Sequence, residues 1–223
     1  MAAPPPTPVR LPFADRADAG RQLGDRLAAV LGPVDPGAGV VLGLPRGGVV
    51  VAAVVARRLG LPLDAFVVRK LGLPWHPELA MGAIASGGVV VHNEVVIGRA
   101  RLSPDDVAEV VAAESAELAR RERAYRGDRP PLSPTGRLAI VVDDGLATGA
   151  TARAALRAVR MQGPSRLVLA VPVAPREAGA LLADDVDQLV CLATPRPFGA
   201  VGRYYRDFAA TGDEEVRTLL DSG

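Results

Sequence analysis

Short runs of uninterrupted apolar residues recur along this 223-residue chain and constrain its fold more than any other feature. A strand with one face in solvent alternates apolar and polar residues, whereas a strand covered on both faces is apolar throughout. We therefore predict buried strands, joined by helices into a parallel sheet. The predicted strands span residues 40–44, 63–69, 89–91, 138–142, 167–173 and 189–193. The expected fold class is α/β, with helices on both faces of the sheet.

The segments between these runs carry helical signals. Apolar residues at helical spacing predict a first helix over residues 19–31. A long helix is predicted to start after Ser103, which suits an N-cap, and to run to about Arg126. Thr211 and Glu214 have the spacing of a capping box for a last helix. Further helices are predicted at residues 49–59, 149–162 and 176–182.

Three segments show no regular period. Residues 1–12 contain five prolines and are predicted to form a flexible N-terminal arm, which leaves residues 13–223 as one domain. Residues 71–88 contain four glycines and two prolines and are predicted to be a long functional loop, with a helical turn near Glu78. Residues 195–208 combine proline, glycine and aromatic residues without a clear pattern.

Composition excludes several classes of protein. An apolar content of 49% and a net charge of +1 exclude a mainly disordered chain and disfavour a nucleic-acid-binding protein. Cys191, the single cysteine, cannot form an intrachain disulfide, and His76 and His92 are too few for a typical zinc site. The first ten residues lack the pattern of a signal peptide, and no segment has the pattern of a membrane span. We therefore expect a cytoplasmic protein with no membrane or nucleic-acid partner.

The segment LAIVVDDGLATGAT, residues 138–151, is the most informative about function. Asp143 and Asp144 end a buried strand, where parallel sheets bind ligands, and the following turn opens a helix. Backbone N–H groups of residues 147–151 at that helix start can bind a phosphate. Two carboxylates alone would repel a phosphate, but they can accept hydrogen bonds from a sugar diol or bind Mg²⁺. The pattern predicts a phosphosugar or nucleotide ligand; the alternative is a strand-end turn whose aspartates cap the helix.

The sequence VVDDGLATGAT resembles the phosphoribosyl pyrophosphate (PRPP) motif of the type I phosphoribosyltransferases. Other segments resemble a bacterial subgroup of that family, and the likeness covers roughly residues 13–220. These segments are LPRGG (44–48), RKLG (69–72), HPELAMGAIASGG (76–88) and ATPRPFGAVGRYY (193–205). The resemblance implies a Rossmann-like parallel-sheet core and a small C-terminal hood that includes residues 195–208. It also implies binding of PRPP with Mg²⁺.

The resemblance further implies roles for single residues. Asp143 and Asp144 would hold the ribose hydroxyls, directly or through Mg²⁺ bound to PRPP, which makes them indirect metal ligands. Arg46 and Gly47 would bind pyrophosphate, although Arg46 can also be read as an ordinary residue at a helix entry. Segment 71–88 would contain a flexible lid. The remaining implied PRPP-binding residues are Gly145, Ala147, Thr148, Gly149, Ala150 and Thr151. The candidate catalytic residues are Arg46, Asp144 and Lys70, and Lys70 is included for its own place in the sequence.

Lys70 is the single lysine among 26 basic residues, and it lies just before the predicted lid. A compact ammonium can approach a crowded anion where a guanidinium cannot. We expect Lys70 to contact pyrophosphate, or the acidic pair in the empty site; the alternative is chance in an arginine-rich chain. His76 is open between a lid residue near the leaving group and a structural residue. The aromatic residues Trp75, Tyr204 and Tyr205 are open between acceptor stacking and core packing.

The expected activity is Mg²⁺-dependent transfer of ribose 5-phosphate from PRPP to a nitrogenous acceptor, with release of pyrophosphate, by a homodimer. Ala147 stands where 6-oxopurine enzymes of the family have an aspartate, so a 6-oxopurine is disfavoured as acceptor. Two alternatives remain. One is a regulatory protein that senses PRPP or a nucleotide without turnover, and the other is a nucleotide hydrolase.

Overall fold

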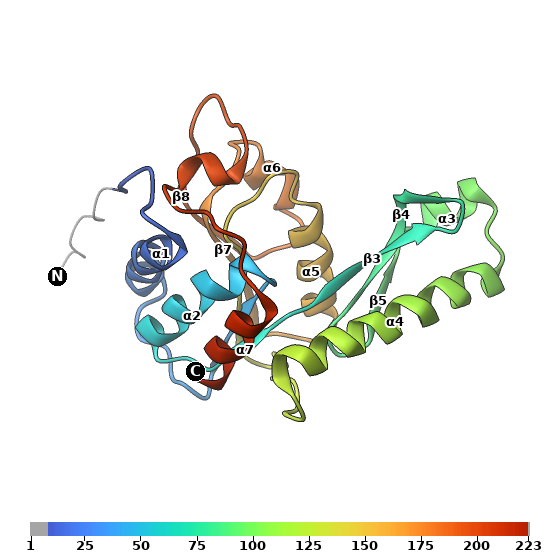
Figure 1. Cartoon of the computed structure of the whole chain (residues 1–223), viewed down its shortest axis with the longest axis horizontal. Coiled ribbons are helices and arrows are strands. Elements are labelled where there is room, and N and C mark those ends of the chain that lie inside the picture. Colours follow the sequence, from blue (N-terminus) through green and yellow to red (C-terminus); the bar gives the residue numbers. More distant parts are fainter. Residues whose placement is uncertain (1–8, 223) are drawn as a thin grey trace.

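The computed structural model describes residues 9–222, and a parallel sheet forms its core (Figure 1). Within these residues five strands pair in the order β2-β1-β6-β7-β8, and all four pairings are parallel. The strands are β1 (Gly39–Gly43), β2 (Leu63–Ala65), β6 (Leu138–Val142), β7 (Arg166–Val173) and β8 (Gln188–Ala193). The predicted parallel sheet is confirmed, and the predicted bounds of the strand at 138–142 match β6.

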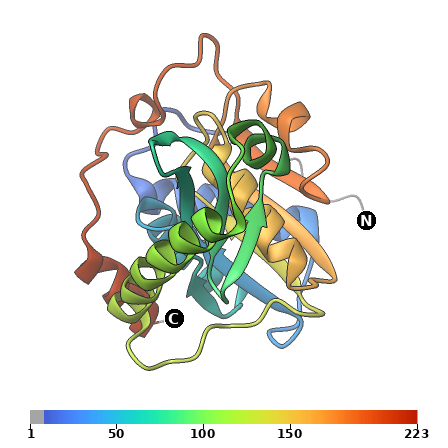
Figure 2. The ribbon, with the colours of Figure 1, turned by 90° about the vertical axis from the view of Figure 1, so that its right-hand side faces the viewer.

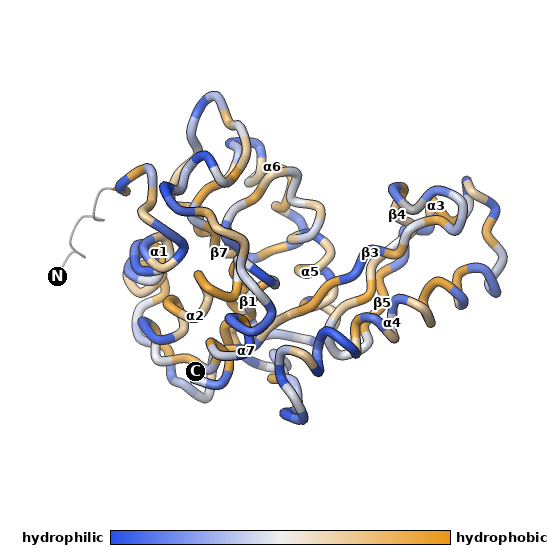
Figure 3. Tube along the Cα trace, viewed as in Figure 1, coloured by the Kyte–Doolittle hydropathy of each residue, from blue (hydrophilic) through white to orange (hydrophobic). Residues whose placement is uncertain are grey.

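Helices cover both faces of this sheet, as predicted. On β6, Ile140 and Val142 pack into the apolar cluster formed with α1 (Arg16–Leu31) and α2 (Gly47–Leu59). Ala139 and Val141 pack into the opposite cluster, formed with α5 (Ala150–Met161) and α6 (Ala178–Leu182). Because alternate residues of a strand face opposite sides, both sets must be apolar. Figure 3 shows this concentration of apolar residues in core strands such as β1 and β7.

A second sheet extends away from the core (Figure 1). Within the described chain it has three antiparallel strands, and two helices accompany it. We call residues 68–126 the extension. Its elements are β3 (Val68–Leu73), β4 (His76–Ala85), β5 (Val89–His92), α3 (Glu94–Ala100) and α4 (Pro104–Arg126). Figure 2, which looks at this side of the molecule, shows α4 lying across the strands.

The prediction of a long loop at residues 71–88 is wrong, because most of that segment forms β3 and β4. Glu78 lies within β4 and not in a helical turn. Leu71, Met81 and Ile84 are buried between the strands and their covering helices, so tertiary packing outweighs the low strand propensity of the glycines and prolines. The predicted strand at 63–69 is likewise divided into β2 and the start of β3, and α3 was not predicted.

The two helix caps predicted from the sequence differ in outcome. Ser103 caps α4 as predicted, because its Oγ accepts from the Asp106 N–H at 3.2 Å and Asp106 Oδ2 accepts from the Ser103 N–H at 2.9 Å. The capping box from Thr211 to Glu214 is wrong. Helix α7 (Asp213–Asp221) instead begins after Gly212, and no side chain of residues 9–222 caps it. The N-cap is thus one residue later than predicted, and glycine has no side chain with which to cap the helix.

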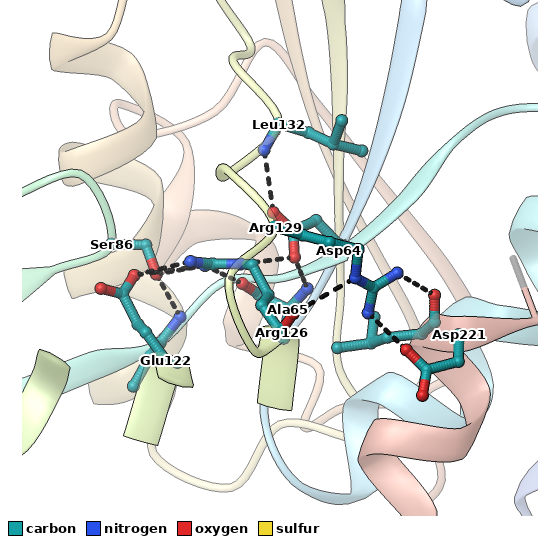
Figure 4. Close-up of polar contacts among 10 residues, drawn as sticks. Asp64, Ala65, Ser86, Glu122, Arg126, Arg129, Leu132 and Asp221 are labelled. Atoms are coloured by element: carbon teal, nitrogen blue, oxygen red, sulfur yellow. Dashed lines mark hydrogen bonds and ion pairs between the residues drawn. The ribbon is translucent and has the colours of Figure 1, made fainter. Parts of the chain in front are cut away.

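The extension joins the core through a buried ion pair (Figure 4). At the end of α4, Arg126 donates from Nε to Asp64 Oδ1 at 2.8 Å and from Nη2 to the Ala65 carbonyl at 2.9 Å. The second oxygen of Asp64 accepts from the Leu132 N–H at 2.9 Å, and Glu122 pairs with Arg126 at 3.2 Å. Buried charges are tolerated when they are paired in this way. The network fixes the base of the extension to edge strand β2.

None of the helices formed by residues 9–222 combines the length and the apolar character that a membrane crossing requires.

Candidate functional site

Asp143 and Asp144 directly follow β6, whose neighbours in the sheet are β1 and β7. Asp143 Oδ1 accepts a hydrogen bond from the Asp144 N–H at 2.9 Å. Loss of hydration at this position raises the pKa of Asp143 well above its usual value, and the neighbouring Asp144 charge raises it further. The acidic pair thus stands at the carboxyl edge of the sheet, where the sequence placed it.

Arg16, the first residue of α1, forms an ion pair with Asp144. Its Nε donates to Asp144 Oδ2 at 2.8 Å, and its Nη1 donates to the Ala209 carbonyl at 2.7 Å. Its guanidinium lies over the Phe208 ring, 3.9 Å from the centroid. Arg16 is not identifiable from the sequence, because nothing local distinguishes it among the 26 basic residues and its partner is 128 positions away.

The loop after the acidic pair opens α5, as predicted. Its start is fixed by the Leu146 N–H, which donates to the Val173 carbonyl at 2.9 Å. Gly145 packs closely enough that a Cβ there would lie 3.0 Å from Val173 Cγ1. Gly149 has a φ of +74° and serves as N-cap, a conformation that glycine adopts at no steric cost. Residues 147, 148, 150 and 151 are exposed or half-buried, so the first turn of α5 is accessible to a ligand.

The turn between β1 and α2 lies directly against the acidic pair. A Cβ on Gly47 would overlap with Asp144 Oδ2 and would lie 2.6 Å from Arg16 Nε, while one on Gly48 would lie 2.9 Å from Asp143 Oδ1. Only glycine therefore fits at residue 47 with the Arg16–Asp144 pair in place. Arg46 is half-exposed, and its Nη1 lies 3.7 Å from Asp213 Oδ1 on α7. The predicted pyrophosphate loop and the acidic pair thus form one continuous surface.

Lys70 lies on β3 and lines a cavity of about 160 Å³ together with Ala150 and Thr151 at the start of α5. Its Nζ donates to Glu78 Oε2 at 3.3 Å. None of the contacts among residues 9–222 joins Lys70 to the acidic pair, so the expected pairing in the empty site is wrong. Both partners are largely exposed, since Lys70 keeps 48% of its side-chain surface and Glu78 87%, and such pairs are weak.

The hood segment, which we define as residues 195–211, is held by the beginning of the described chain. Phe13 pairs with Tyr205 in a parallel bridge, and their rings lie 5.3 Å apart. The Tyr205 hydroxyl donates to the Asp144 carbonyl, and burial raises the pKa of that hydroxyl. Tyr205 therefore packs as a core residue, whereas Trp75 remains exposed on the extension.

Three other residues were singled out in the sequence: His76, Tyr204 and Cys191. His76 is the first residue of β4. Tyr204 stacks near Phe198 at 5.4 Å and donates to the Pro197 carbonyl at 3.2 Å. Burial raises the pKa of the Cys191 thiol to about 11, so the thiol stays protonated at neutral pH, as expected for an unreactive cysteine.

Comparison with known proteins gives consistent matches. Residues 35–198 match the family model described as "Phosphoribosyl transferase domain". Two curated proteins of Mycobacterium tuberculosis, from strains CDC 1551 and H37Rv, are each 50% identical to the chain over 209 residues, which cover 94% of it and 46% of theirs. They carry the names "Putative phosphoribosyl transferase MT0597" and "Putative phosphoribosyl transferase Rv0571c". The chain spans about half the length of these relatives.

A solved structure extends the comparison to three dimensions. The crystal structure of TT1426 from Thermus thermophilus superimposes with a TM-score of 0.82 at 45% sequence identity, over 93% of this chain and 97% of that one. The family model spans the acidic pair and both adjoining loops, whereas Arg16 and most of the hood segment lie outside it. Since that model covers most of the sheet that carries the site, we conclude that the chain belongs to the family of type I phosphoribosyltransferases.

Proposed function

We propose that this site binds PRPP and transfers its ribose 5-phosphate to a nitrogenous acceptor, with release of pyrophosphate. The observation that carries the proposal is the acidic pair after β6, flanked on one side by an accessible helix start and on the other by a glycine turn. These three features suit the diol, the 5′-phosphate and the pyrophosphate of one ligand. Membership of the phosphoribosyltransferase family supports the same assignment.

Each part of the site has a task in donor binding. The N–H groups of residues 147–151 bind the 5′-phosphate at the positive end of α5. Asp143 and Asp144 accept hydrogen bonds from the ribose hydroxyls. The turn with Arg46 and Gly47 binds pyrophosphate, and Lys70 contributes a mobile cation across the cavity from Thr151.

The residues present also fit Mg²⁺. Among residues 9–222 no group of three or more His, Cys, Asp or Glu side chains could hold a metal ion. That is compatible with Mg²⁺, which often binds through one or two carboxylates together with substrate phosphates and water. Asp143 and Asp144 supply those carboxylates. Bound Mg²⁺ would neutralise charge on the departing pyrophosphate.

In the reaction the bond from C1 of the ribose to the pyrophosphate oxygen breaks, and pyrophosphate leaves with the electron pair. The lone pair of the acceptor nitrogen forms the new bond to C1, and the nitrogen loses a proton to solvent. The protein aligns donor and acceptor, stabilises the leaving group with Arg46 and Lys70, and limits the access of water. The hood segment would cover the acceptor; the hydrogen bond from the Tyr205 hydroxyl to the Asp144 carbonyl, which holds the segment beside the acidic pair, supports this role.

The test is to titrate PRPP calorimetrically in the presence of Mg²⁺ and to measure pyrophosphate release with a panel of nitrogenous bases. Release that depends on one base supports transfer. Tight binding without release for any base supports the regulatory alternative, and release without any base supports hydrolysis. Absence of PRPP binding contradicts the proposal. The homodimer also belongs to the proposal, and light scattering during size-exclusion chromatography tests it.

A further inference from the structure

Arg16 connects parts of the site that come from distant segments, and no role described above uses it. From the start of α1 it contacts Asp144 after β6, and it contacts Phe208 and Ala209 in the hood segment. Its side chain is only 12% exposed. It lies outside the residues that match the family model, so membership of the family assigns it no role.

The contact with Arg16 uses one of the two oxygens of the Asp144 carboxylate. Arg16 Nε takes Oδ2 at 2.8 Å. Among the contacts of residues 9–222, Asp144 Oδ1 accepts no hydrogen bond from protein. Since none of the described buried polar side-chain atoms lacks a partner, this oxygen is accessible to solvent. Oδ2 also lies where a Cβ of Gly47 would be, so this oxygen is enclosed between Gly47 and Arg16. Oδ1 is therefore the oxygen that remains available to a ligand.

Three different surfaces of one guanidinium make these contacts. Nε bonds to Asp144, Nη1 bonds to the Ala209 carbonyl, and the planar face stacks on Phe208. A planar fork can satisfy all three contacts at once, whereas a lysine ammonium can replace only one or two of them. The arrangement depends on the shape of arginine and not only on its charge.

We propose that Arg16 is a positioning residue for donor binding. It holds Asp144 so that Oδ1 faces the ribose hydroxyls of PRPP, and it ties this orientation to the hood segment. The proposal rests on the function proposed above. Arg16 itself does not contact the donor, so its whole effect on binding passes through Asp144.

The experiment measures binding of PRPP with Mg²⁺ to Arg16→Gln and Arg16→Lys by calorimetry. We expect at least a tenfold loss of affinity in Arg16→Gln and only partial recovery in Arg16→Lys, with circular dichroism showing both folded. Arg58→Lys is the matched control, because Arg58 also pairs through Nε with an aspartate, Asp25, but on an exposed surface. The control should bind like the parent protein.

Two further readouts separate positioning from a merely structural role. In an Asp144→Asn background, adding Arg16→Gln should change the affinity for PRPP less than twofold, because the partner through which Arg16 acts is already altered. Inorganic pyrophosphate has no ribose, so its affinity in Arg16→Gln should stay within about twofold of the parent value. If Arg16→Gln does not fold, Arg16→Lys replaces it in both measurements.

The outcomes distinguish the two proposals. Parent protein that fails to bind PRPP contradicts the proposed function and this inference with it. Parent protein that binds PRPP, combined with unchanged affinity in the Arg16 variants, contradicts the positioning role alone. Equal losses with and without Asp144→Asn, or an equal loss for pyrophosphate, do the same, because they mean that Arg16 supports the whole site.

Discussion

Asp144 is the residue on which the contacts of the site converge. Its carboxylate accepts from Arg16, its carbonyl accepts from the Tyr205 hydroxyl, and its N–H donates to Asp143. Gly47 lacks a side chain at the point where this carboxylate lies. Substitutions here therefore test ligand binding only when folding of each variant is measured beside it.

The first prediction concerns the acidic pair. Asp143→Asn combined with Asp144→Asn should weaken binding of PRPP with Mg²⁺ at least tenfold, because amide oxygens accept weaker hydrogen bonds than carboxylates. Calorimetry measures this change. Asp25→Asn, on an exposed aspartate, is the control, and unchanged affinity in the double variant would remove the pair from the donor site.

Thermal stability should respond differently to the same change at Asp143. Its pKa is raised in the folded chain, so the stability that this group contributes is present below its unfolded pKa and is lost as pH rises through the folded pKa. At neutral pH Asp143→Asn removes that cost while keeping an acceptor for the Asp144 N–H. We expect a Tm equal to or above the parent value at pH 7, and a clear fall in Tm would contradict this account.

Lys70 gives a third prediction at the residue scale. Its exposed pair with Glu78 is weak, so the ammonium is free to move to a ligand. Lys70→Arg should reduce PRPP affinity about tenfold with little change in Tm, because the larger planar guanidinium cannot approach a crowded anion as the compact ammonium does. Arg58→Lys again serves as control. Parent-like affinity and turnover in Lys70→Arg would leave the lysine as a chance exception to the arginine bias.

At the scale of elements, the turn between β1 and α2 packs closely against the acidic pair that follows β6. Their strands are neighbours in register, with Gly43 opposite Val142. This pairing brings Gly47 and Gly48 against the two aspartates. The two loops depend on each other, because the aspartate side chains occupy the space that side chains at residues 47 and 48 would fill.

Gly47→Ala tests that match. The added methyl would overlap with Asp144 Oδ2, so the carboxylate must leave its Arg16 contact, and PRPP affinity should fall at least tenfold. The matched control is Gly98→Ala in α3, where a Cβ meets nothing within 4 Å and helix propensity improves. Gly98→Ala should bind normally and be as stable as the parent. Normal PRPP binding in Gly47→Ala would mean that the acidic pair tolerates displacement.

At the scale of the whole molecule, Arg126 holds the extension to the core. The same junction includes Arg129, which donates to the Leu220 carbonyl at 2.7 Å and pairs with Asp221 at 2.9 Å, so α7 is tied in as well (Figure 4). Lys70 of the extension lines the same cavity as Ala150 and Thr151 at the start of α5. The junction therefore bears on the position of Lys70 as well as on stability.

Arg126→Met should destabilise the protein by about 3–5 kcal/mol, because it leaves Asp64 buried without its cation. Denaturant unfolding measures the change. Adding Asp64→Asn should restore part of the loss, since the unpaired charge is then gone. Arg217→Met, which breaks an exposed pair with Glu214, should cost at most about 1 kcal/mol. A loss in Arg126→Met no larger than in this control would show that the junction is not held by charge.

Local sequence was sufficient for the core and for the loops at its edge. The apolar runs predicted the buried parallel strands because their signal depends on neighbouring residues alone. The same holds for the Ser103 cap and for the glycine turn that opens α5. The acidic pair at the end of a predicted parallel strand placed the candidate site before any contact was known.

Only the tertiary structure decided the extension, the contacts that hold the hood segment, and the contacts of Arg16. Residues 71–88 have weak strand propensity, and they pair because Leu71 and Met81 become buried in a cluster that includes apolar residues of α4, later in the chain. Arg16 and Tyr205 reach Asp144 from opposite ends of the sequence, across 128 and 61 positions. Contacts between segments so distant leave no pattern in either segment. The sequence by itself therefore determined the parallel sheet and the loops at its edge. Only folding determined that Arg16 and Tyr205 hold Asp144 in place.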